Sequence, residues 1–535
     1  MKTQTGRIFR LACLLALALA PAWSAARQTA AQGPRTAAEA LARVRAAVGY
    51  ERLRAQEGGV AAEGAARVRG VDSTFTFSFA PGGRFRTDVT GPLGAASGFD
   101  GAEGWEVDWT GMPQRLELHD LEATQFNAWV FSGRWLDEGG PFAVTLDASK
   151  SGAGQVALGL ALKGGLLEAT AYVDAATWLP KRFTRRTTAG EEVVELSDYR
   201  EALGFRFPHR VTRAAGGVTN VFETRAVAAL PAGAAASRFA PVTARPDDSR
   251  WDASRPAVVE SRRARSGHML VRALVNGKDV GWFVLDSGAG GMVIDPRAAD
   301  RLSLPALGEV VAVGAHGRTK ARFRLGDTLA VGPLTVRGTR YMELDLDFLR
   351  RAFGVEVGGV CGRDVFMRAV VEVDVTGGTV ALHDPARFRL EGAAWQELFF
   401  SSRHPAVRAR FEGGREALFK LDTGSDRTVS FHGPAVERLG LLAGRETHET
   451  HSTGVGGAKA SREGRLAWFE LAGHRFESPE VEFTGAREGA FSDVYTAGNI
   501  GAGFLRQFRV VFDYGDRRIA FAPRGAAKAA GAGSP

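Results

Sequence analysis

Residues 282–294 read WFVLDSGAGGMVI, and the interpretation of the whole chain starts from this stretch. The apolar run at its start predicts a buried strand that ends at Asp286, and a glycine-rich turn follows. A carboxylate at the end of a buried strand is costly unless it is hydrogen-bonded, paired or protonated. The glycines behind it allow backbone N–H groups to approach closely. The stretch therefore predicts a buried aspartate that is satisfied by a tight turn.

The same pattern returns at residues 418–429, LFKLDTGSDRTV, where Asp422 takes the place of Asp286. A glycine lies nine residues before each aspartate, at Gly277 and Gly413. Farther along, GRDVFMRAVVEVD and GAGFLRQFRVVFD keep the same register, with a glycine at the start and an aspartate at the end. The two aspartates are 136 residues apart, which is far longer than the period of a solenoid. This pattern indicates two copies of one domain.

These motifs resemble the pepsin and retropepsin superfamily of aspartic proteases. The resemblance rests on Asp-Ser-Gly-Ala at 286–289, on Asp-Thr-Gly-Ser at 422–425, and on the later elements that end at Gly362 and Gly501. Gly-Arg-Asp at 362–364 is similar to the retropepsin version, whereas the second copy lacks the arginine and the aspartate. The resemblance implies a mainly β fold, in which two β-barrel lobes, 265–385 and 386–525, form one bilobal unit.

The resemblance also implies an aspartic-type endopeptidase. Asp286 and Asp422, one from each lobe, would activate a water that hydrolyses a peptide bond, with no metal and no cofactor. The dyad support would come from Ser287, Gly288, Thr423 and Gly424. One alternative is a non-catalytic periplasmic protein that binds peptide or lipid. Another is that each lobe builds a site with a second chain.

Two glycine-rich hairpin tips occupy the position of the flap in the resembled family. Flaps exclude water and hold the substrate backbone. The alternative is an ordinary turn at each place. The flap candidates are Gly314, His316 and Gly317 in the first lobe, and Gly454, Gly456 and Gly457 in the second.

The first 26 residues have the pattern of a secretory signal peptide. Lys2, Arg7 and Arg10 precede an apolar run, and small residues follow it. Cys13 also permits a lipid anchor, but Arg10 stands where a lipobox needs an apolar residue. We therefore expect cleavage near Ala26 and a periplasmic or secreted bacterial protein.

Residues 35–243 predict a separate antiparallel domain behind a helix. Thr36 and Glu39 form a capping box, and Phe75, Phe77 and Phe79 then alternate with polar residues as in a strand. FDGAEGWEVD, YVDAATWLPKRF and DYREALGFRFPHRV resemble the outer-membrane lipoprotein carrier fold, LolA-like, a curved half-barrel with helix. That resemblance implies a cavity for an acyl chain or another apolar ligand. Aromatic residues at strand period more often fill a core, and that interpretation is favoured.

The remaining features limit the choice of partners. The composition is globular, with 45% hydrophobic and 24% charged residues, and the net charge of +8 is scattered without aromatic interleaving. We therefore expect a polypeptide substrate and no nucleic acid. No run after the signal peptide is long enough for a transmembrane segment. Residues 244–264 predict a linker, and residues 526–535 predict a disordered tail.

Overall fold

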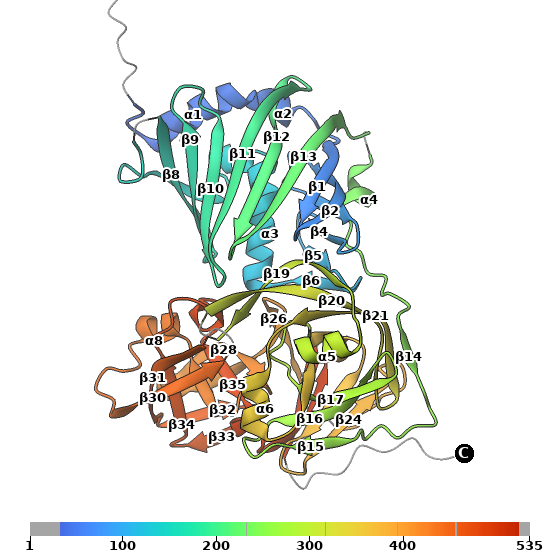
Figure 1. The fold of residues 1–535 in the computed structure, drawn as a ribbon. Helices are drawn as coiled ribbons and strands as arrows, with labels where there is room; N and C mark the ends of the chain where they lie inside the picture. The colour runs from blue at the N-terminus through green and yellow to red at the C-terminus, as the bar shows by residue number, and fades with distance from the viewer. Residues whose placement is uncertain are drawn as a thin grey trace, which may run out of the picture.

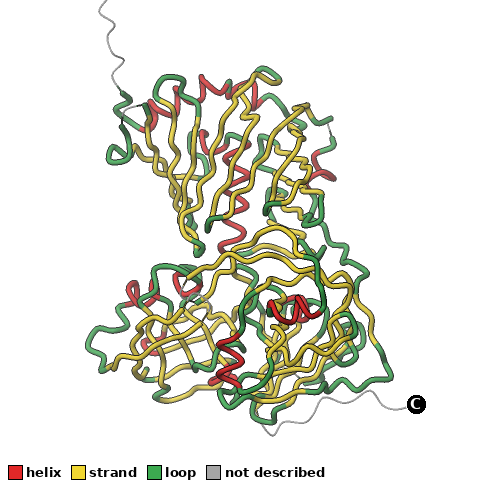
Figure 2. Tube along the Cα trace, in the orientation of Figure 1, coloured by secondary structure: helices red, strands yellow, loops and turns green. Residues whose placement is uncertain are grey.

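The structure is a computed structural model that describes residues 33–523 apart from positions 153, 232, 316, 393 and 455–456. The predicted signal peptide and the predicted tail lie outside these residues. Strands dominate the chain (Figure 2), as the predicted fold class requires. A half-barrel stands above a broader unit of two lobes (Figure 1). Within the described part, no helix is long and apolar enough to cross a membrane.

The N-terminal half-barrel is one antiparallel sheet of 13 strands among the described residues, in the order β6-β5-β4-β3-β2-β1-β13-β12-β11-β10-β9-β8-β7. Helix α3 (Leu118–Phe131) lies inside the curve of the sheet (Figure 1). The other helices are α1 (Ala37–Val48), α2 (Tyr50–Arg54), η1 (Arg134–Leu136) and α4 (Ala235–Phe239). The strands are β1 (Val60–Val68), β2 (Val71–Phe79), β3 (Phe85–Thr90), β4 (Ala95–Phe99), β5 (Gly104–Val107), β6 (Pro113–Leu116), β7 (Phe142–Leu146), β8 (Gln155–Leu162), β9 (Glu168–Asp174), β10 (Pro180–Thr187), β11 (Gly190–Ala202), β12 (Phe205–Ala215) and β13 (Val218–Ala229).

Local sequence explains the start of this domain. The Thr36 side chain accepts a hydrogen bond from the Glu39 backbone N–H at 3.2 Å, so the predicted cap opens α1. The phenylalanines of β2 are all buried, and Phe79 stacks on Phe207 in the core. Phe75 and Phe77 belong to the same core cluster and also line a cavity. The favoured core interpretation is therefore incomplete, because the same alternation serves both a core and a cavity wall.

Lobe 1 contains a mixed sheet that includes β17 and β22, which run parallel to each other. Its helices are α5 (Pro296–Arg301), α6 (Asp347–Phe353) and α7 (Arg363–Phe366). Its strands are β16 (Met269–Val275), β17 (Lys278–Leu285), β18 (Met292–Ile294), β19 (Ala306–Gly314), β20 (Gly317–Val331), β21 (Leu334–Glu343), β22 (Val357–Cys361), β23 (Val370–Asp374) and β24 (Thr379–His383).

The segment predicted as a linker, 244–264, is not a plain connection. It contains β14 (Ser249–Trp251), which pairs with β21, and β15 (Ser261–Arg263), which pairs with β16. Three-residue strands are too short to show a period in the sequence, which is why the composition alone suggested a linker. The segment is therefore held along the first lobe by backbone hydrogen bonds.

Lobe 2 repeats the arrangement, with β28 and β35 as the parallel pair that corresponds to β17 and β22. Its helices are η2 (Glu412–Gly414), α8 (Gly433–Leu439), η3 (Ala490–Ser492) and α9 (Ala502–Leu505). Its strands are β25 (Trp395–Glu397), β26 (Phe399–Ser401), β27 (His404–Phe411), β28 (Arg415–Asp422), β29 (Val429–Phe431), β30 (Thr447–Gly454), β31 (Gly457–Arg465), β32 (Trp468–Leu471), β33 (His474–Glu477), β34 (Glu480–Thr484), β35 (Gly498–Gly501), β36 (Phe508–Asp513) and β37 (Arg518–Pro523).

One sheet is shared by both lobes. Its strand order is β24-β23-β36-β37-β25, so the last strands of the first copy pair directly with the last strands of the second. The central pair is antiparallel, with Val373 opposite Val510. Apolar residues of both copies also belong to one continuous core. The shared sheet and core therefore hold the two aspartate turns in a fixed relation.

Candidate active site

Each of the two aspartates lies at the end of a buried strand. β17 ends at Leu285 and leads into Asp286, while β28 ends at Asp422 itself. Phe283, Leu285 and Leu421 are each at most 1% exposed, so these strands are anchored in the core. Both aspartates keep partial exposure to solvent. The predicted strand-and-turn arrangement is thus present twice.

The two turns are joined by reciprocal hydrogen bonds. The Ser287 backbone N–H donates to Thr423 Oγ1 at 2.9 Å, and the Thr423 backbone N–H donates to Ser287 Oγ at 3.1 Å. The same hydroxyls donate across the interface, Ser287 Oγ to the Leu421 carbonyl at 2.9 Å and Thr423 Oγ1 to the Leu285 carbonyl at 2.8 Å. Since all four groups are buried, these bonds fix the turns against each other.

This arrangement brings Asp286 and Asp422 together, and their carboxyl groups are hydrogen-bonded to each other. The glycine of each turn lies against the carboxyl of the opposite lobe. A Cβ added to Gly288 would lie 2.6 Å from Asp422 Oδ1, and one added to Gly424 would lie 2.4 Å from Asp286 Cγ. Such distances leave no room for a side chain. The predicted support residues Gly288 and Gly424 are therefore required by close packing rather than by an unusual φ.

Electrostatics favours one shared proton on this pair. Burial, followed by the charge of Asp422, raises the pKa of Asp286 to about 8, although the Gly288 and Gly424 backbone N–H groups oppose this shift. Burial also raises the pKa of Asp422, while a hydrogen bond from Asn499 acts in the opposite direction. Two adjacent buried carboxyls cannot both ionise cheaply. The pair can therefore hold a proton donor and a proton acceptor side by side.

Asn499 makes the two halves of the site unequal. Its Nδ2 donates to Asp422 Oδ2 at 2.9 Å, and this bond favours the ionised form of Asp422. At the same register of the first copy stands Val360, which has no side-chain donor. Asn499 is itself held by His432, whose Nε2 lies 2.9 Å from Asn499 Oδ1. The asymmetry favours ionisation of Asp422 and protonation of Asp286.

We expect Asn499→Val to move the acidic limb of the pH–activity profile to higher pH. Loss of the Nδ2 donor raises the pKa of Asp422, so that kcat/KM at pH 4 falls roughly tenfold, while kcat/KM near pH 7 changes much less. The measurement is kcat/KM for peptide hydrolysis from pH 3 to 9. The matched variant Val360→Asn adds a donor on the Asp286 side and should move the alkaline limb to lower pH. Unchanged profiles in both variants would contradict the assignment.

Two further residues of the site were not predicted. His268 lies in the core next to the second turn, and its Nε2 is 2.8 Å from the Gly424 carbonyl oxygen. The Tyr514 hydroxyl, also buried, lies 3.5 Å from the Ser287 carbonyl oxygen. Neither residue belongs to a motif, and both reach the turns only through the folded chain. Both residues support the backbone of the turns, and the nearby His268 also opposes the rise in the pKa of Asp422.

The two predicted flap tips meet each other above lobe 2. The β19–β20 tip contacts the 489–491 loop, where the Phe491 backbone N–H donates to the Ala315 carbonyl at 3.3 Å. A Cβ added to Gly454 on the β30–β31 tip would lie 3.4 Å from Ala315 Cβ. Gly314 and Gly317 are paired at the end of their hairpin, as are Gly454 and Gly457. His316 and Gly456 lie outside the described residues.

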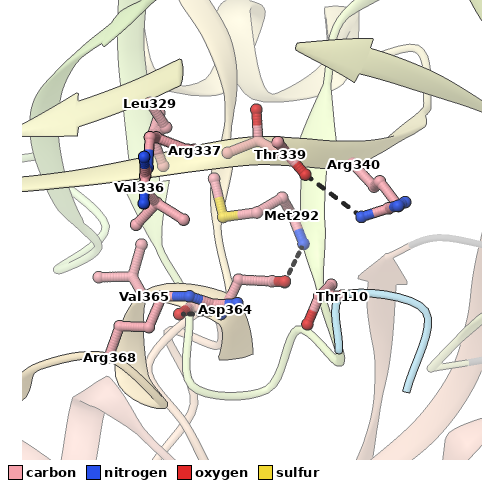
Figure 3. A pocket seen from close by; sticks show the side chains of 11 residues that line it. Thr110, Met292, Leu329, Val336, Arg337, Thr339, Arg340, Asp364, Val365 and Arg368 are labelled. Carbon is pink, nitrogen blue, oxygen red and sulfur yellow. Dashed lines mark hydrogen bonds between the residues drawn. The ribbon is translucent and has the colours of Figure 1, made fainter. Parts of the chain in front are cut away.

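Other carboxylates have structural partners. Asp374 accepts a hydrogen bond from the Gly377 backbone N–H at 2.7 Å, and Asp513 accepts one from Arg518 at 2.9 Å. Asp426, four residues after Asp422, is exposed. Asp364 accepts a hydrogen bond from the Met292 backbone N–H at 3.0 Å, beside a cavity of about 10 Å³ that Thr110 also lines (Figure 3). That volume fits about one water molecule, so it is no ligand site.

One group of metal-ligating side chains occurs among the described residues. It consists of His448, Glu463 and Glu480, whose ligand atoms lie within 4.8 Å of one another on the β30–β31–β34 surface of lobe 2. This group is separate from the aspartate pair, and its first and last members are exposed. Cys361, the described free cysteine, is buried, and burial raises the pKa of its thiol.

Comparison with known families agrees with this geometry. A family model described as aspartyl protease matches residues 271–365 and again residues 407–504, so each match spans one aspartate turn. The tandem aspartyl protease resemblance is confirmed. The two matched segments contain Asp286 and Asp422 at equivalent places, together with the glycine-bearing strands β22 and β35.

Similar solved structures cover the two parts of the chain separately. An aspartic proteinase from Irpex lacteus has 13% identity and a TM-score of 0.35, over 51% of this chain and 99% of that chain. A LolA superfamily protein from Nitrosomonas europaea has 13% identity and a TM-score of 0.24, over 34% of this chain and 94% of that chain. These scores carry no argument about activity. No curated protein matches the chain.

Proposed function

We propose that the chain is an exported aspartic endopeptidase that hydrolyses peptide bonds with a water held between Asp286 and Asp422. The ionised Asp422 takes a proton from the water as it attacks the scissile carbonyl. The protonated Asp286 donates to the carbonyl oxygen, and a proton then passes to the leaving amine. The observation that carries this proposal is the contact of two partly buried carboxyls, one from each copy, with unequal surroundings.

The test is peptide hydrolysis by the purified full chain, measured with an unfolded protein as substrate. Activity should be bell-shaped in pH, because the pair must hold one proton. It should fall as pH rises through about 8, where Asp286 loses its proton. It should also fall in acid, where Asp422 becomes protonated. The matched control is the double variant Asp286→Asn, Asp422→Asn. Equal activity in the control, or none in the wild type at any pH, would count against an endopeptidase.

A second function is favoured by the cavity in the N-terminal domain. We propose that this cavity, of about 300 Å³, binds an acyl chain or another apolar ligand. Its wall contains the aromatic side chains of Phe75, Phe77, Phe85, Phe131, Phe207 and Phe222. Apolar side chains that line an empty cavity lack packing contacts on one side. An apolar ligand in the cavity would supply those contacts.

A further inference from the structure

The cavity of the half-barrel has a charged end. Among its lining residues, Arg69 and Arg213 come from the N-terminal domain, and Arg403 comes from the β26–β27 turn of lobe 2. The Arg69 carbonyl accepts a hydrogen bond from the Glu309 backbone N–H of β19 at 2.7 Å. The arginine end of the cavity therefore lies at the junction with the lobes.

Carboxylates balance the arginines at this end unequally, because Arg403 lies near Asp108, Asp120 and Asp364 as well as Glu106. Arg403 pairs with Glu106 at 3.0 Å, and Glu106 is the acidic residue in the cavity wall. Arg213 pairs with Glu192 at 2.6 Å, but Glu192 also pairs with Arg185. Arg69 has no carboxylate within ion-pair distance among the residues that the structure describes. Its guanidinium lies over Trp109, 4.9 Å from the ring centre.

An unbalanced cation in a confined, largely apolar space is costly to keep charged. Burial, followed by the nearby charge of Arg403, lowers the pKa of Arg69 to about 10, although the charges of Glu106 and Asp108 oppose this shift. Arg403 lies over the same Trp109 ring at 4.0 Å, so both guanidinium groups contact one indole. An anionic group that reaches this end of the cavity would give Arg69 the ion-pair partner that it lacks and would form charge-assisted hydrogen bonds.

We propose that the ligand of the half-barrel is a single-chain anionic amphiphile. Its hydrocarbon chain lies along the phenylalanine wall, and its carboxylate or phosphate head binds Arg69 and Arg403 at the junction with the lobes. The inference rests on the apolar-ligand function proposed above and adds the head-group site to it. The site is composite, because neither the N-terminal domain nor the lobes alone supply both arginines.

The test compares ligands that share one ten-carbon chain and differ in the head group. Binding of decanoate, decyl phosphate, 1-decanol and decyltrimethylammonium to the full chain would be measured by calorimetry at pH 8. We expect the better of the two anions to bind at least about tenfold more tightly than decanol, and the cation to bind more weakly than decanol. Which anion binds more tightly identifies the head group as a carboxylate or a phosphate.

Variants of the full chain test whether Arg69 causes the preference for an anion over decanol. Arg69→Gln should lower the affinity for the anion to that for decanol. Arg69→Lys should keep most of the wild-type difference between these two affinities, because lysine keeps the positive charge. Arg206→Gln, an exposed arginine of the same domain, should change neither affinity. Equal affinity of wild type for anion and alcohol would overturn the head-group site while leaving the apolar cavity in place. Binding of none of the four compounds would overturn both proposals.

Discussion

Asp286→Asn and Asp422→Asn should each abolish peptide hydrolysis, with kcat/KM lower by about 10³-fold or more. One carboxyl must accept a proton from water while the other donates one, so neither can replace its partner. The asparagine keeps the size of the side chain, and the glycines packed against it need not move. The measurement is hydrolysis of an unfolded protein substrate by each single variant at several pH values. Wild-type activity in either variant would contradict the shared site.

Mixing the two inactive variants tests whether the site forms within one chain. The sequence between the copies is short and the lobes share a sheet, so the partner turn is always close by. Mixed variants should therefore stay inactive. Recovery of activity would show that lobes pair between chains.

The same variants carry a control for folding. A carboxyl with a raised pKa binds its proton more tightly in the folded chain, so stability is lost as pH rises from the unfolded value toward about 8. Asp286→Asn removes that pH-dependent loss. The inactive variant should therefore melt at a higher temperature than wild type at pH 8, with little difference at pH 4.

Lys420→Met should strongly destabilise lobe 2. Lys420 Nζ lies 2.6 Å from Asp493 Oδ2, with the two side chains 5% and 3% exposed. Asp493 also accepts a hydrogen bond from Thr496 at 3.0 Å, and Thr496 contacts His432. Removing the cation leaves a buried carboxylate without a counter-charge, which costs about 3–5 kcal/mol. The measurement is the free energy of unfolding from urea denaturation at pH 7.

The pH dependence separates this electrostatic effect from simple loss of packing. In the wild type, Lys420 holds the pKa of Asp493 well below its usual range against the effect of burial, so this stabilisation is present at neutral pH and lost as pH falls. The difference in the free energy of unfolding between Lys420→Met and wild type should therefore become smaller at acidic pH. Arg487→Met removes an exposed pair with Glu437 at 3.0 Å and should change stability by less than about 1 kcal/mol. A similar loss of stability in Lys420→Met and Arg487→Met would contradict the role of the buried ion pair.

The aspartate pair could be predicted because it is encoded locally and twice. Each aspartate follows a buried strand and precedes Ser-Gly or Thr-Gly, and the repeated register shows that the two segments have equivalent places. The hydrogen bonds between Ser287 and Thr423 follow from that equivalence. The mainly β fold follows in the same way from the short alternating segments.

The features that sequence analysis missed depend on contacts between distant residues. Asn499 reaches Asp422 across 77 positions, and its role appears only when it is compared with Val360 in the first copy. The charged end of the cavity depends on Arg403, which comes from lobe 2 and pairs with Glu106 of the half-barrel. The phenylalanine alternation is the same for a core and for a cavity wall, so the sequence could not distinguish them.

The sheet shared by the lobes would be broken if the two lobes were separated. Cutting the chain between β24 and β25 and separating the halves would leave β23 and β36 as uncovered edges, because each pairs with the other. An uncovered apolar edge strand is a template for pairing with other chains. Val371, Val373, Val510 and Phe512 lie on these two strands and are each at most 1% exposed in the intact chain. Each half alone would therefore tend to self-associate.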